Sequence, residues 1–347
     1  MTDRRDFLAA IIDRPDDDLP RLVYADYLEE SGDEERAEFI RLQCELAKLP
    51  PDDPARIPLA VREKELLKNR EAWIVPGMVA TRQTFHRGFV ESMETTAESL
   101  VRFADAIFCS TPLRHLRAAN ADGPVEDFVR IEGLKYLTFL DVSNCSSPTV
   151  NRILENAPLA RLERLAARNC RIWPEGVAAM AGSPVVVRLK ALDIAGNPIT
   201  DEGVAIIASV PSFAALNHLM LRSNEQSEER CIHLMGARAI ADSQTLNVLV
   251  TLDLAGHYIG DAGLFELGGS RNFGTLRELD LSYNEIGASG IESYRSFVNS
   301  PLASRLRYLN LSGNRIDPES EAVLREWQSR RADRKLEMGE PEGDILE

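Results

Sequence analysis

The sequence lacks the apolar run of about 20 residues that a membrane-spanning helix requires. It also lacks a secretory signal, because the apolar stretch at residues 7–12 is flanked by charges and precedes no small-residue cleavage site. Hydrophobic residues still make up 44% of the chain, which is enough for a folded core. We therefore expect a soluble cytoplasmic protein without a membrane partner.

Cysteine is scarce and scattered, which argues against disulfides and metal sites. The five cysteines are Cys44, Cys109, Cys145, Cys170 and Cys231, and they form no C-x-x-C pair and no Cys/His cluster. The acidic triplet at residues 16–18 lacks the spacing of a calcium loop, so we interpret it as a solvated turn and helix cap. The sequence predicts reduced thiols, no metal and no cofactor.

Positive charge is in deficit. The chain has 40 Lys and Arg residues against 55 Asp and Glu, which gives a formal net charge of −15. Nucleic acids and anionic membranes are bound mainly through basic surfaces, so neither is expected as a partner. A protein with a basic surface would complement this charge.

Recognisable catalytic motifs are absent as well. The chain has no H-E-x-x-H, no G-x-S-x-G, no Walker loop and no dinucleotide fingerprint. Its five histidines lie at positions 86, 115, 218, 233 and 257, too scattered to suggest a nucleophile with a base beside it. We therefore expect that the protein is not an enzyme.

What the sequence does contain is an internal repeat with the pattern L-x-x-L-x-L-x-x-N-x-I. The clearest copies begin at Leu189, Leu276 and Leu306, and altered or weaker copies begin at Leu113, Leu137, Leu162, Leu216 and Leu249. Successive copies are 24 to 33 residues apart, which leaves room for a helix after each short strand. The pattern predicts short strands, each returning through a helix.

The polar position of the repeat predicts a buried ladder. Asparagine suits this position because its amide can satisfy both donors and acceptors of the neighbouring backbone. The predicted ladder residues are Cys145, Cys170, Asn197, Asn224, His257, Asn284 and Asn314. For the two cysteines, a small buried thiol is favoured over redox or metal chemistry.

Together with the glycine that follows four residues after the ladder isoleucine, for example Gly203 and Gly263, this pattern closely resembles the ribonuclease-inhibitor-like class of leucine-rich repeats over residues 111 to 328. The resemblance implies an α/β horseshoe solenoid with parallel strands on the concave face and helices on the convex face. Members of that class bind proteins, and some act as activators of small GTPases. The insert at residues 225–231 departs from the pattern and is expected to form a projecting loop.

Residues that alternate with the buried leucines should face solvent on the concave side. Asp253 and Asp280 would lie about 4.8 Å apart on neighbouring strands, close enough for one Arg or Lys of a partner to bind both. The predicted partner-binding residues are Asp141, Asp193, Asp253, Asp280, Asn310, Phe139, Arg222, Tyr283, Arg307 and Tyr308. The alternative is that the sequence L-D-L is common in strands of this kind whatever their function. The aromatic and Arg residues would then be ordinary surface residues without a role in binding.

The first residues form a separate acidic helical unit. The segment DDLPRLVYADYLEESGDEERAEFIRLQCEL resembles the repeat-companion domain that precedes leucine-rich repeats in certain bacteria, and the likeness continues to about residue 93. No activity comes with that resemblance. Charged residues such as Arg21 and Arg36 are spaced for salt bridges within the unit.

We divide the chain by these patterns into a companion domain at 1–49, a connector with a helix at 50–88, a solenoid with a terminal helical cap at 89–328 and a charged flexible tail at 329–347. An edge strand is expected at 89–93. The favoured function is a non-catalytic protein-binding module or scaffold that uses the concave face, with a monomer as the expected state. The alternative is a regulator of an enzyme, such as a small-GTPase activator-like protein.

Overall fold

The computed structural model describes residues 4–77, 80–224 and 227–339. The chain divides into two compact units. The N-terminal unit contains Met1–Asp141 and Ala157–Leu162, and the C-terminal unit contains Val142–Asn156 and Glu163–Glu347.

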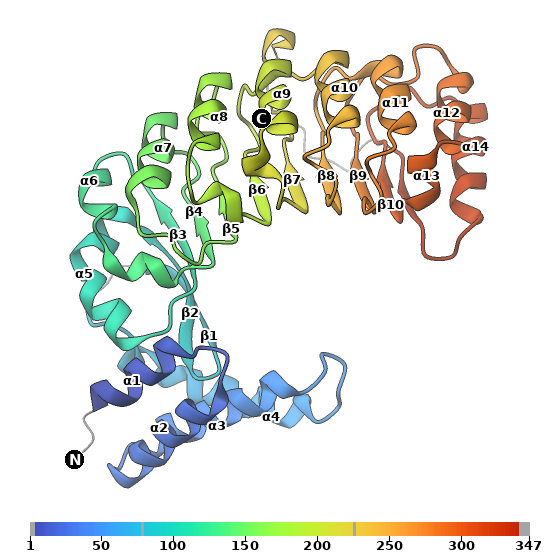
Figure 1. Cartoon of the computed structure of the whole chain (residues 1–347). Coiled ribbons are helices and arrows are strands. Elements are labelled where there is room, and N and C mark those ends of the chain that lie inside the picture. The colour runs from blue at the N-terminus through green and yellow to red at the C-terminus, as the bar shows by residue number, and fades with distance from the viewer. Residues whose placement is uncertain (1–3, 78–79, 225–226, 340–347) are drawn as a thin grey trace. The chain divides into compact units, whose positions relative to one another are not determined.

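The N-terminal unit begins with a group of helices. These are α1 (Arg4–Asp13), α2 (Asp18–Glu30), α3 (Glu34–Lys48), α4 (Arg56–Leu66) and the 3-10 helix η1 (Leu67–Trp73) (Figure 1). Asp17 caps α2 by accepting the backbone N–H of Leu19, at 2.9 Å. Its neighbours Asp16 and Asp18 form ion pairs with Arg114 at 2.6 Å and Lys48 at 3.2 Å. The acidic triplet therefore caps helix α2 and forms ion pairs with basic side chains of the unit.

The strands of this unit follow the helices. They are β1 (Ala80–His86), β2 (Phe89–Thr96), β3 (His115–Ala119) and β4 (Phe139–Asp141), accompanied by α5 (Ala97–Ser110), α6 (Val125–Phe128) and η2 (Glu132–Tyr136). β1 pairs antiparallel with β2, and β2, β3 and β4 are parallel. The expected edge strand at 89–93 is therefore not at the edge, because β1 from the predicted connector covers its outer side.

Two arginines are buried in the N-terminal unit. Arg21 of α2 forms an ion pair with Glu91 of β2 at 2.6 Å, and both side chains are buried. The Arg36 guanidinium of α3 lies 4.8 Å from the centre of the Trp73 ring and 5.1 Å from that of Phe89. Burial lowers the pKa of Arg36 to about 10. Both arginines thus form interactions within the unit.

The C-terminal unit is an ordered series of short parallel strands. They are β5 (Arg164–Ala166), β6 (Ala191–Asp193), β7 (His218–Met220), β8 (Thr251–Asp253), β9 (Glu278–Asp280), β10 (Tyr308–Asn310) and β11 (Lys335–Glu337). Each strand pairs with the next in the sequence. The leucine in the middle of a strand pairs with the leucine of its neighbour, as Leu252 does with Leu279, and these leucines are buried in β5 to β10. The sheet therefore has one apolar face and one face toward solvent.

Helices cover the apolar face of the sheet in this unit (Figure 1). They are α7 (Ser147–Asn156), α8 (Pro174–Ala181), α9 (Thr200–Ser209), α10 (Leu234–Asp242), α11 (Gly260–Gly269), α12 (Ile291–Val298), α13 (Pro301–Arg305) and α14 (Pro318–Ser329), with 3-10 turns η3 (Val186–Arg188), η4 (Pro211–Phe213) and η5 (Glu228–Arg230). Each repeat is thus a strand followed by a helix. The fold is the α/β leucine-rich-repeat solenoid that the spacing predicts, preceded by helices.

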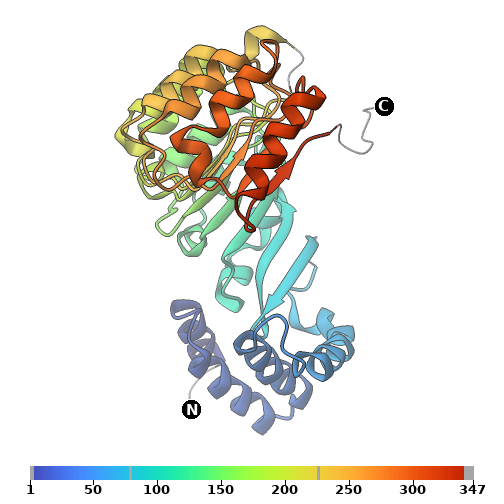
Figure 2. The same ribbon diagram turned by 90° about the vertical axis from the view of Figure 1, so that its right-hand side faces the viewer.

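The end of the chain differs from the sequence prediction. Lys335–Glu337 form β11, which pairs with β10, whereas a flexible tail was expected from residue 329 (Figure 2). The strand forms because the exposed edge of β10 offers unpaired backbone groups, and Leu336 falls in register with Leu309. The buried Trp327 of α14 donates its indole N–H to the Ala303 carbonyl at 3.0 Å. Residues 340–347 lie outside the described residues.

Candidate protein-binding face

The ladder position of the repeat is occupied by asparagines that join neighbouring rows. Asn197 accepts the backbone N–H groups of Cys170 at 2.8 Å and Ile172 at 3.0 Å through its amide oxygen. Its amide nitrogen donates to the Ala167 carbonyl at 2.9 Å and the Ile194 carbonyl at 2.7 Å. One side chain therefore satisfies four backbone groups that water cannot reach.

Two further asparagines repeat this arrangement. Asn284 donates to the Leu254 carbonyl at 2.8 Å, and Asn314 donates to the Leu281 carbonyl at 2.8 Å. Asn314 also accepts the backbone N–H of Ile286 at 3.1 Å. These contacts keep the distance between successive strand-to-helix loops constant. The strands therefore end along one edge of the sheet.

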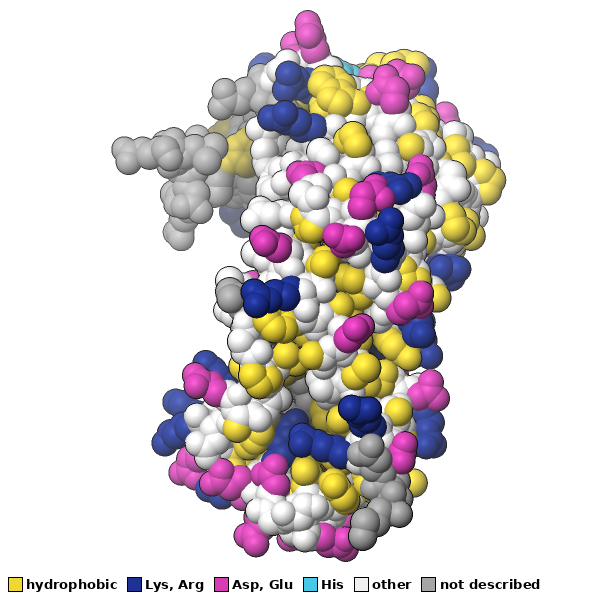
Figure 3. Space-filling model, turned by 90° about the vertical axis from the view of Figure 1, so that its left-hand side faces the viewer, with side chains coloured by type: hydrophobic (Ala, Val, Ile, Leu, Met, Phe, Trp, Pro, Cys, Tyr) yellow, Lys and Arg dark blue, Asp and Glu magenta, His cyan; other side chains and the backbone are white. Residues whose placement is uncertain are grey.

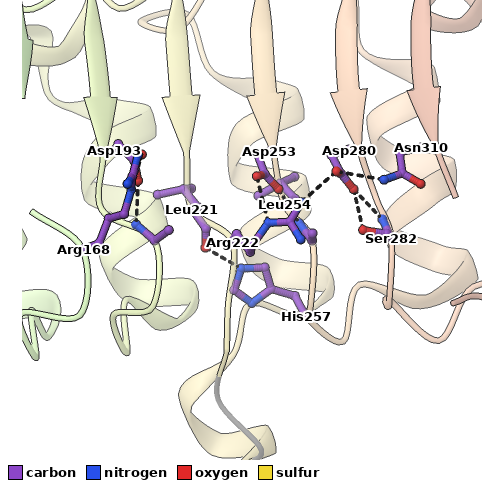
Figure 4. A network of polar contacts seen from close by, with 12 residues as sticks. Arg168, Asp193, Leu221, Arg222, Asp253, Leu254, His257, Asp280, Ser282 and Asn310 are labelled. Atoms are coloured by element: carbon purple, nitrogen blue, oxygen red, sulfur yellow. Dashed lines mark hydrogen bonds and ion pairs between the residues drawn. The ribbon is translucent and has the colours of Figure 1, made fainter. Parts of the chain in front are cut away.

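His257 fills the same position with an imidazole. Its Nδ1 accepts the backbone N–H of Ile232 at 3.1 Å, and its Nε2 lies 2.9 Å from the Leu221 carbonyl (Figure 4). A carbonyl only accepts, so Nε2 carries the proton and the ring is neutral. Burial lowers the pKa of His257 to about 4. The imidazole thus reproduces one acceptor and one donor of the asparagine.

The remaining ladder positions differ from the asparagine pattern. Cys145 and Cys170 are buried, and the thiol of Cys170 lies 3.5 Å from the Val142 carbonyl. Asn224 is exposed. Cys231 is buried there instead, with its sulfur 3.6 Å from the Ser223 hydroxyl. The insert predicted at 225–231 as a projecting loop therefore ends inside the core, and residues 225–226 lie outside the described residues.

The acidic column on the solvent side of the sheet has a structural role. Asp193 accepts the backbone N–H of Ala195 at 3.2 Å, and Asp253 accepts that of Ala255 at 3.0 Å. Asp280 and Asn310 make the same contact with the N–H two residues later, at 2.9 and 3.0 Å. A short side chain that accepts this bond closes the turn after each strand. This bond explains why Asp or Asn recurs in the column.

In the column aspartates Asp193, Asp253 and Asp280, the second carboxylate oxygen is paired with an arginine of the chain itself. Arg168 binds Asp193 at 2.5 Å, and Arg222 bridges Asp253 at 3.2 Å and Asp280 at 2.9 Å (Figure 4). Burial raises the pKa of Asp253, against the opposing effects of the Ala255 N–H and Arg222. The arginine that the sequence assigned to a partner between Asp253 and Asp280 is therefore Arg222.

Other predicted residues occupy different surroundings. Phe139 and Asp141 belong to the N-terminal unit, where Asp141 is buried and binds Arg117 at 2.7 Å. Tyr308 donates its hydroxyl to Glu337 at 3.0 Å, and Arg307 lies 3.4 Å from Asp333. Both contacts involve residues that the sequence assigned to the flexible tail.

Tyr283 is the most exposed aromatic residue of the predicted set, at 44%. Its backbone has a φ of 55°, which is in the left-handed region that bulky side chains rarely adopt. The corresponding left-handed positions in other rows are Asn144, Asn169, Gly196, Gly256 and Gly313. A Cβ at Gly313 would overlap the Tyr283 ring, so this glycine leaves space for the ring. The tyrosine is thus held in a defined place on the surface at the expense of a strained backbone.

A hydrogen-bonded row on the sheet face was not predicted. His218 Nδ1 lies 3.0 Å from the Thr251 hydroxyl, which donates to Glu278 at 2.9 Å. Since that hydroxyl has one proton and Glu278 takes it, His218 donates from Nδ1. The alternation of the strands placed His218 toward solvent, but only the register of three strands brings the three side chains together.

Acidic and basic side chains are interspersed on the face in Figure 3. Among the described residues, no group of three or more His, Cys, Asp or Glu is placed to hold a metal ion. Within residues 4–77, 80–224 and 227–339, no helix has both the length and the apolar character to cross a membrane.

Comparison with known families identifies the repeats. Residues 189–208, 245–268, 275–293 and 305–320 match a family model described as leucine-rich repeat. The C-terminal unit therefore carries leucine-rich repeats, and proteins with such repeats generally use them to bind other proteins. A search of curated proteins gave no match.

Solved structures of repeat proteins are similar to the chain at low identity. An internalin from Listeria monocytogenes is 18% identical, with 72% of each chain covered and a TM-score of 0.38. The complex of Rad7 and Elc1 from yeast gives 12% identity, 92% coverage of each chain and a TM-score of 0.43. A leucine-rich repeat protein from Bacteroides eggerthii is 16% identical over 71% of this chain and 44% of that one, with a TM-score of 0.35.

Proposed function

We propose that the protein is a non-catalytic binding module whose partner is a protein that contacts the solvent-facing side of strands β6 to β10. The observation that carries the proposal is that Arg222 is held in place on this face by two aspartates while 43% of its side chain stays exposed. A guanidinium has five N–H donors, so donors remain for a ligand after both contacts are made. Because the aspartates fix its position, little rotamer entropy is lost when a partner binds.

Tyr283 supports the same proposal. Tyrosine and arginine are the residue types that most often dominate the energy of protein interfaces. Tyr283 follows β9 and Arg222 follows β7, so both lie at the edge where the strands end. We propose that Tyr283 is an aromatic anchor for an apolar part of the partner and that Arg222 donates to a carbonyl or carboxylate.

The expected charge of the partner changes once the contacts of the aspartates are known. The expectation of a basic partner rested on the net charge and on the acidic column. Asp193, Asp253 and Asp280 are already paired with Arg168 and Arg222, which offset most of their negative charge, so they attract a further cation less than free carboxylates would. We propose that acceptor groups of the partner, rather than cations, meet this face.

The finer classification also belongs to this proposal. A helix in nearly every return segment supports assignment to the ribonuclease-inhibitor-like class. The helices at the start of the chain support a repeat-companion domain. The five free cysteines suit a protein of the cytoplasm, where thiols stay reduced.

The test uses a variant that the fold itself suggests. Tyr283→Asn removes the aromatic ring but keeps a residue type that other rows place in the left-handed position, so the fold should be retained. A partner isolated by affinity capture and identified by mass spectrometry is purified, and its Kd is measured by calorimetry. We expect Tyr283→Asn to weaken binding at least tenfold.

Phe265→Ser is the matched control. Phe265 is 65% exposed on α11, on the helical side of the same unit. If Phe265→Ser weakens binding and Tyr283→Asn does not, the partner binds the helices and the proposal is wrong.

A further inference from the structure

The N-terminal unit contains a cavity that is lined by residues of α3, α4 and the hairpin of β1 and β2. Its volume is about 360 Å³, which is within the range of sites for small molecules. The lining includes Gln43, Ala47, Leu49, Arg56, Glu63 and Phe85. Ala47 lies one helical turn after the buried Gln43 and is exposed, so the cavity is open to solvent. We call it the Glu63 cavity.

Two opposite charges of α4 line the cavity, and neither is paired with another charge. Arg56 donates through Nη1 to the carbonyls of Leu46 at 2.6 Å and Leu49 at 2.9 Å. Glu63 accepts a side-chain N–H of Gln43 at 2.7 Å. These partners are all neutral, and among the described residues neither Arg56 nor Glu63 has an ion-pair partner. Both charges are therefore held in place without being compensated.

The remaining charges of the lining differ in this respect. Arg87 lies 3.5 Å from Asp18, and Nδ1 of His86 lies 3.2 Å from Glu91. Each of these basic groups thus has a carboxylate beside it. The charge that the cavity offers to a ligand comes mainly from the two residues of α4, one positive and one negative.

The spacing of these two residues suits a small molecule that bridges them. Arg56 and Glu63 are seven residues apart, so they lie on the same side of α4, two turns from each other. The rise of the helix separates their Cα atoms by about 10 Å. Their side chains do not pair with each other, which leaves room for a ligand that carries a carboxylate at one end and an ammonium at the other.

Both groups are oriented before a ligand binds. The Gln43 amide oxygen accepts the Gly88 N–H at 2.6 Å, so the amide that donates to Glu63 is fixed at both ends. Arg56 is fixed by two carbonyls and still has N–H donors that they do not use. Both charged side chains are half-buried, so water weakens their electrostatic interactions less than it would at an exposed site.

We propose that the Glu63 cavity binds a small zwitterion of the amino acid type. The carboxylate of the ligand accepts N–H groups of Arg56, and its ammonium donates to Glu63. Phe85 and Leu49 line the same cavity and offer an apolar wall to the side chain of the ligand, so apolar amino acids fit best. The inference goes beyond the proposed function and does not depend on it, because the proposed partner contacts strands of the C-terminal unit.

The test measures the binding of L-leucine to the full chain by isothermal titration calorimetry, beside two molecules of similar shape. Isocaproate lacks the ammonium, and isoamylamine lacks the carboxylate. We expect L-leucine to bind with a Kd below about 1 mM. Each of the other two should bind at least tenfold more weakly, because each leaves one charge of the cavity without a partner.

Two variants separate the roles of the charges. Glu63→Gln keeps an acceptor for Gln43 and removes only the charge, so it should raise the Kd of L-leucine at least tenfold without weakening isocaproate. Arg56→Gln should also weaken L-leucine, without weakening isoamylamine. A general loss of structure would instead weaken all three molecules. The matched control is Glu65→Gln, because Glu65 is an exposed residue of the same helix that does not line the cavity, and it should leave all three Kd values unchanged.

Three results would overturn the inference. One is the absence of saturable binding of both L-leucine and L-phenylalanine at up to about 20 mM. Another is binding of isocaproate or isoamylamine as tight as that of L-leucine, which would assign the cavity to an ion of one sign. The third is binding of L-leucine that survives Glu63→Gln. Because the titration contains no partner protein, its failure leaves the Tyr283 experiment unaffected, and the reverse also holds.

Discussion

The N-terminal unit buries charged side chains, whereas the C-terminal unit buries neutral ones. In the first, Arg21 and Glu91 form an ion pair out of contact with water, and Arg36 lies among aromatic rings. In the second, the buried polar side chains are serine and threonine hydroxyls, the amides of Asn197 and Asn284 and one neutral imidazole. Charges in the C-terminal unit are kept on the surface of the sheet.

The difference follows from repetition. Each repeat presents the same backbone donors and acceptors at the same distance, so one neutral amide can satisfy them in every row. In the N-terminal unit every buried polar group has different neighbours. Arg21 reaches both Glu91 and the Pro15 carbonyl at 2.6 Å, contacts that no short amide could span. An irregular domain therefore depends on single long-range pairs, and a solenoid depends on many equivalent small ones.

Removal of the buried cation should have the largest effect. Arg21→Met leaves the Glu91 carboxylate buried without its main partner, and we expect the free energy of unfolding of the N-terminal unit to fall by about 4 kcal/mol. Hydrogen exchange in urea, resolved by peptide, measures this unit separately from the other. The double variant Arg21→Met/Glu91→Leu should recover at least half of the loss. A loss below about 1 kcal/mol in the single variant would contradict the assignment.

A ladder asparagine should have the next largest effect. Asn284→Ala leaves the Leu254 carbonyl and the Ile259 N–H buried without a partner, and we expect a loss of about 3 kcal/mol in urea unfolding. Asn314 makes equivalent bonds but is half-buried, so water can replace them. Asn314→Ala should therefore lose only about 1 kcal/mol. Equal losses of stability in the two variants would show that burial does not determine how much each ladder asparagine contributes to stability.

The histidine of the ladder makes stability depend on pH. Its pKa is about 4 in the folded chain, below the ordinary value of 6.5, so the unfolded state binds a proton that the folded state excludes. Stability from this site is complete above pH 6.5 and is lost as the pH falls toward 4. At pH 5 the loss should be about 2 kcal/mol.

His257→Asn tests this dependence, because Asn occupies the same position in other rows and does not titrate. Urea midpoints of the two proteins should agree near pH 7 and separate at pH 5, with the variant more stable. Parallel curves at both pH values would show that the imidazole is not the group responsible.

The surface charges of the sheet should have the smallest effect. Arg222→Met leaves Asp253 and Asp280 without their shared cation, but solvent screens the half-exposed pair, so we expect a loss below about 1 kcal/mol. The difference from the unchanged protein should shrink in 1 M NaCl. A loss of stability as large as that of Arg21→Met would contradict the contrast between the buried charges of the N-terminal unit and the surface charges of the C-terminal unit.

The repeat pattern alone could predict much of the solenoid. The recurring leucines place each strand and its buried side, because alternation along a strand needs no tertiary information. The same spacing located the ladder positions that Asn197, His257, Asn284 and Asn314 occupy. The exposure of Asn224 could not be predicted in this way, since the length of an insert does not reveal where the chain turns inward.

The candidate site was predictable only in part. Alternation placed Arg222 and Tyr283 near the end of a strand, and Asp253 beside Asp280. The partner of these aspartates could not be predicted, because the choice between an internal and an external arginine depends on how far Arg222 extends across two rows.

What the sequence determined by itself is therefore everything that repeats within about 30 residues, because a strand and its returning helix are set by local alternation and turn chemistry. Tertiary structure decided the contacts between rows and between distant segments. Arg21 and Glu91 are 70 residues apart, and β10 pairs with β11 although helix α14 separates them in the sequence. Such pairs form because a buried polar group or an open strand edge must find a partner, and only the folded chain determines which partner is within reach.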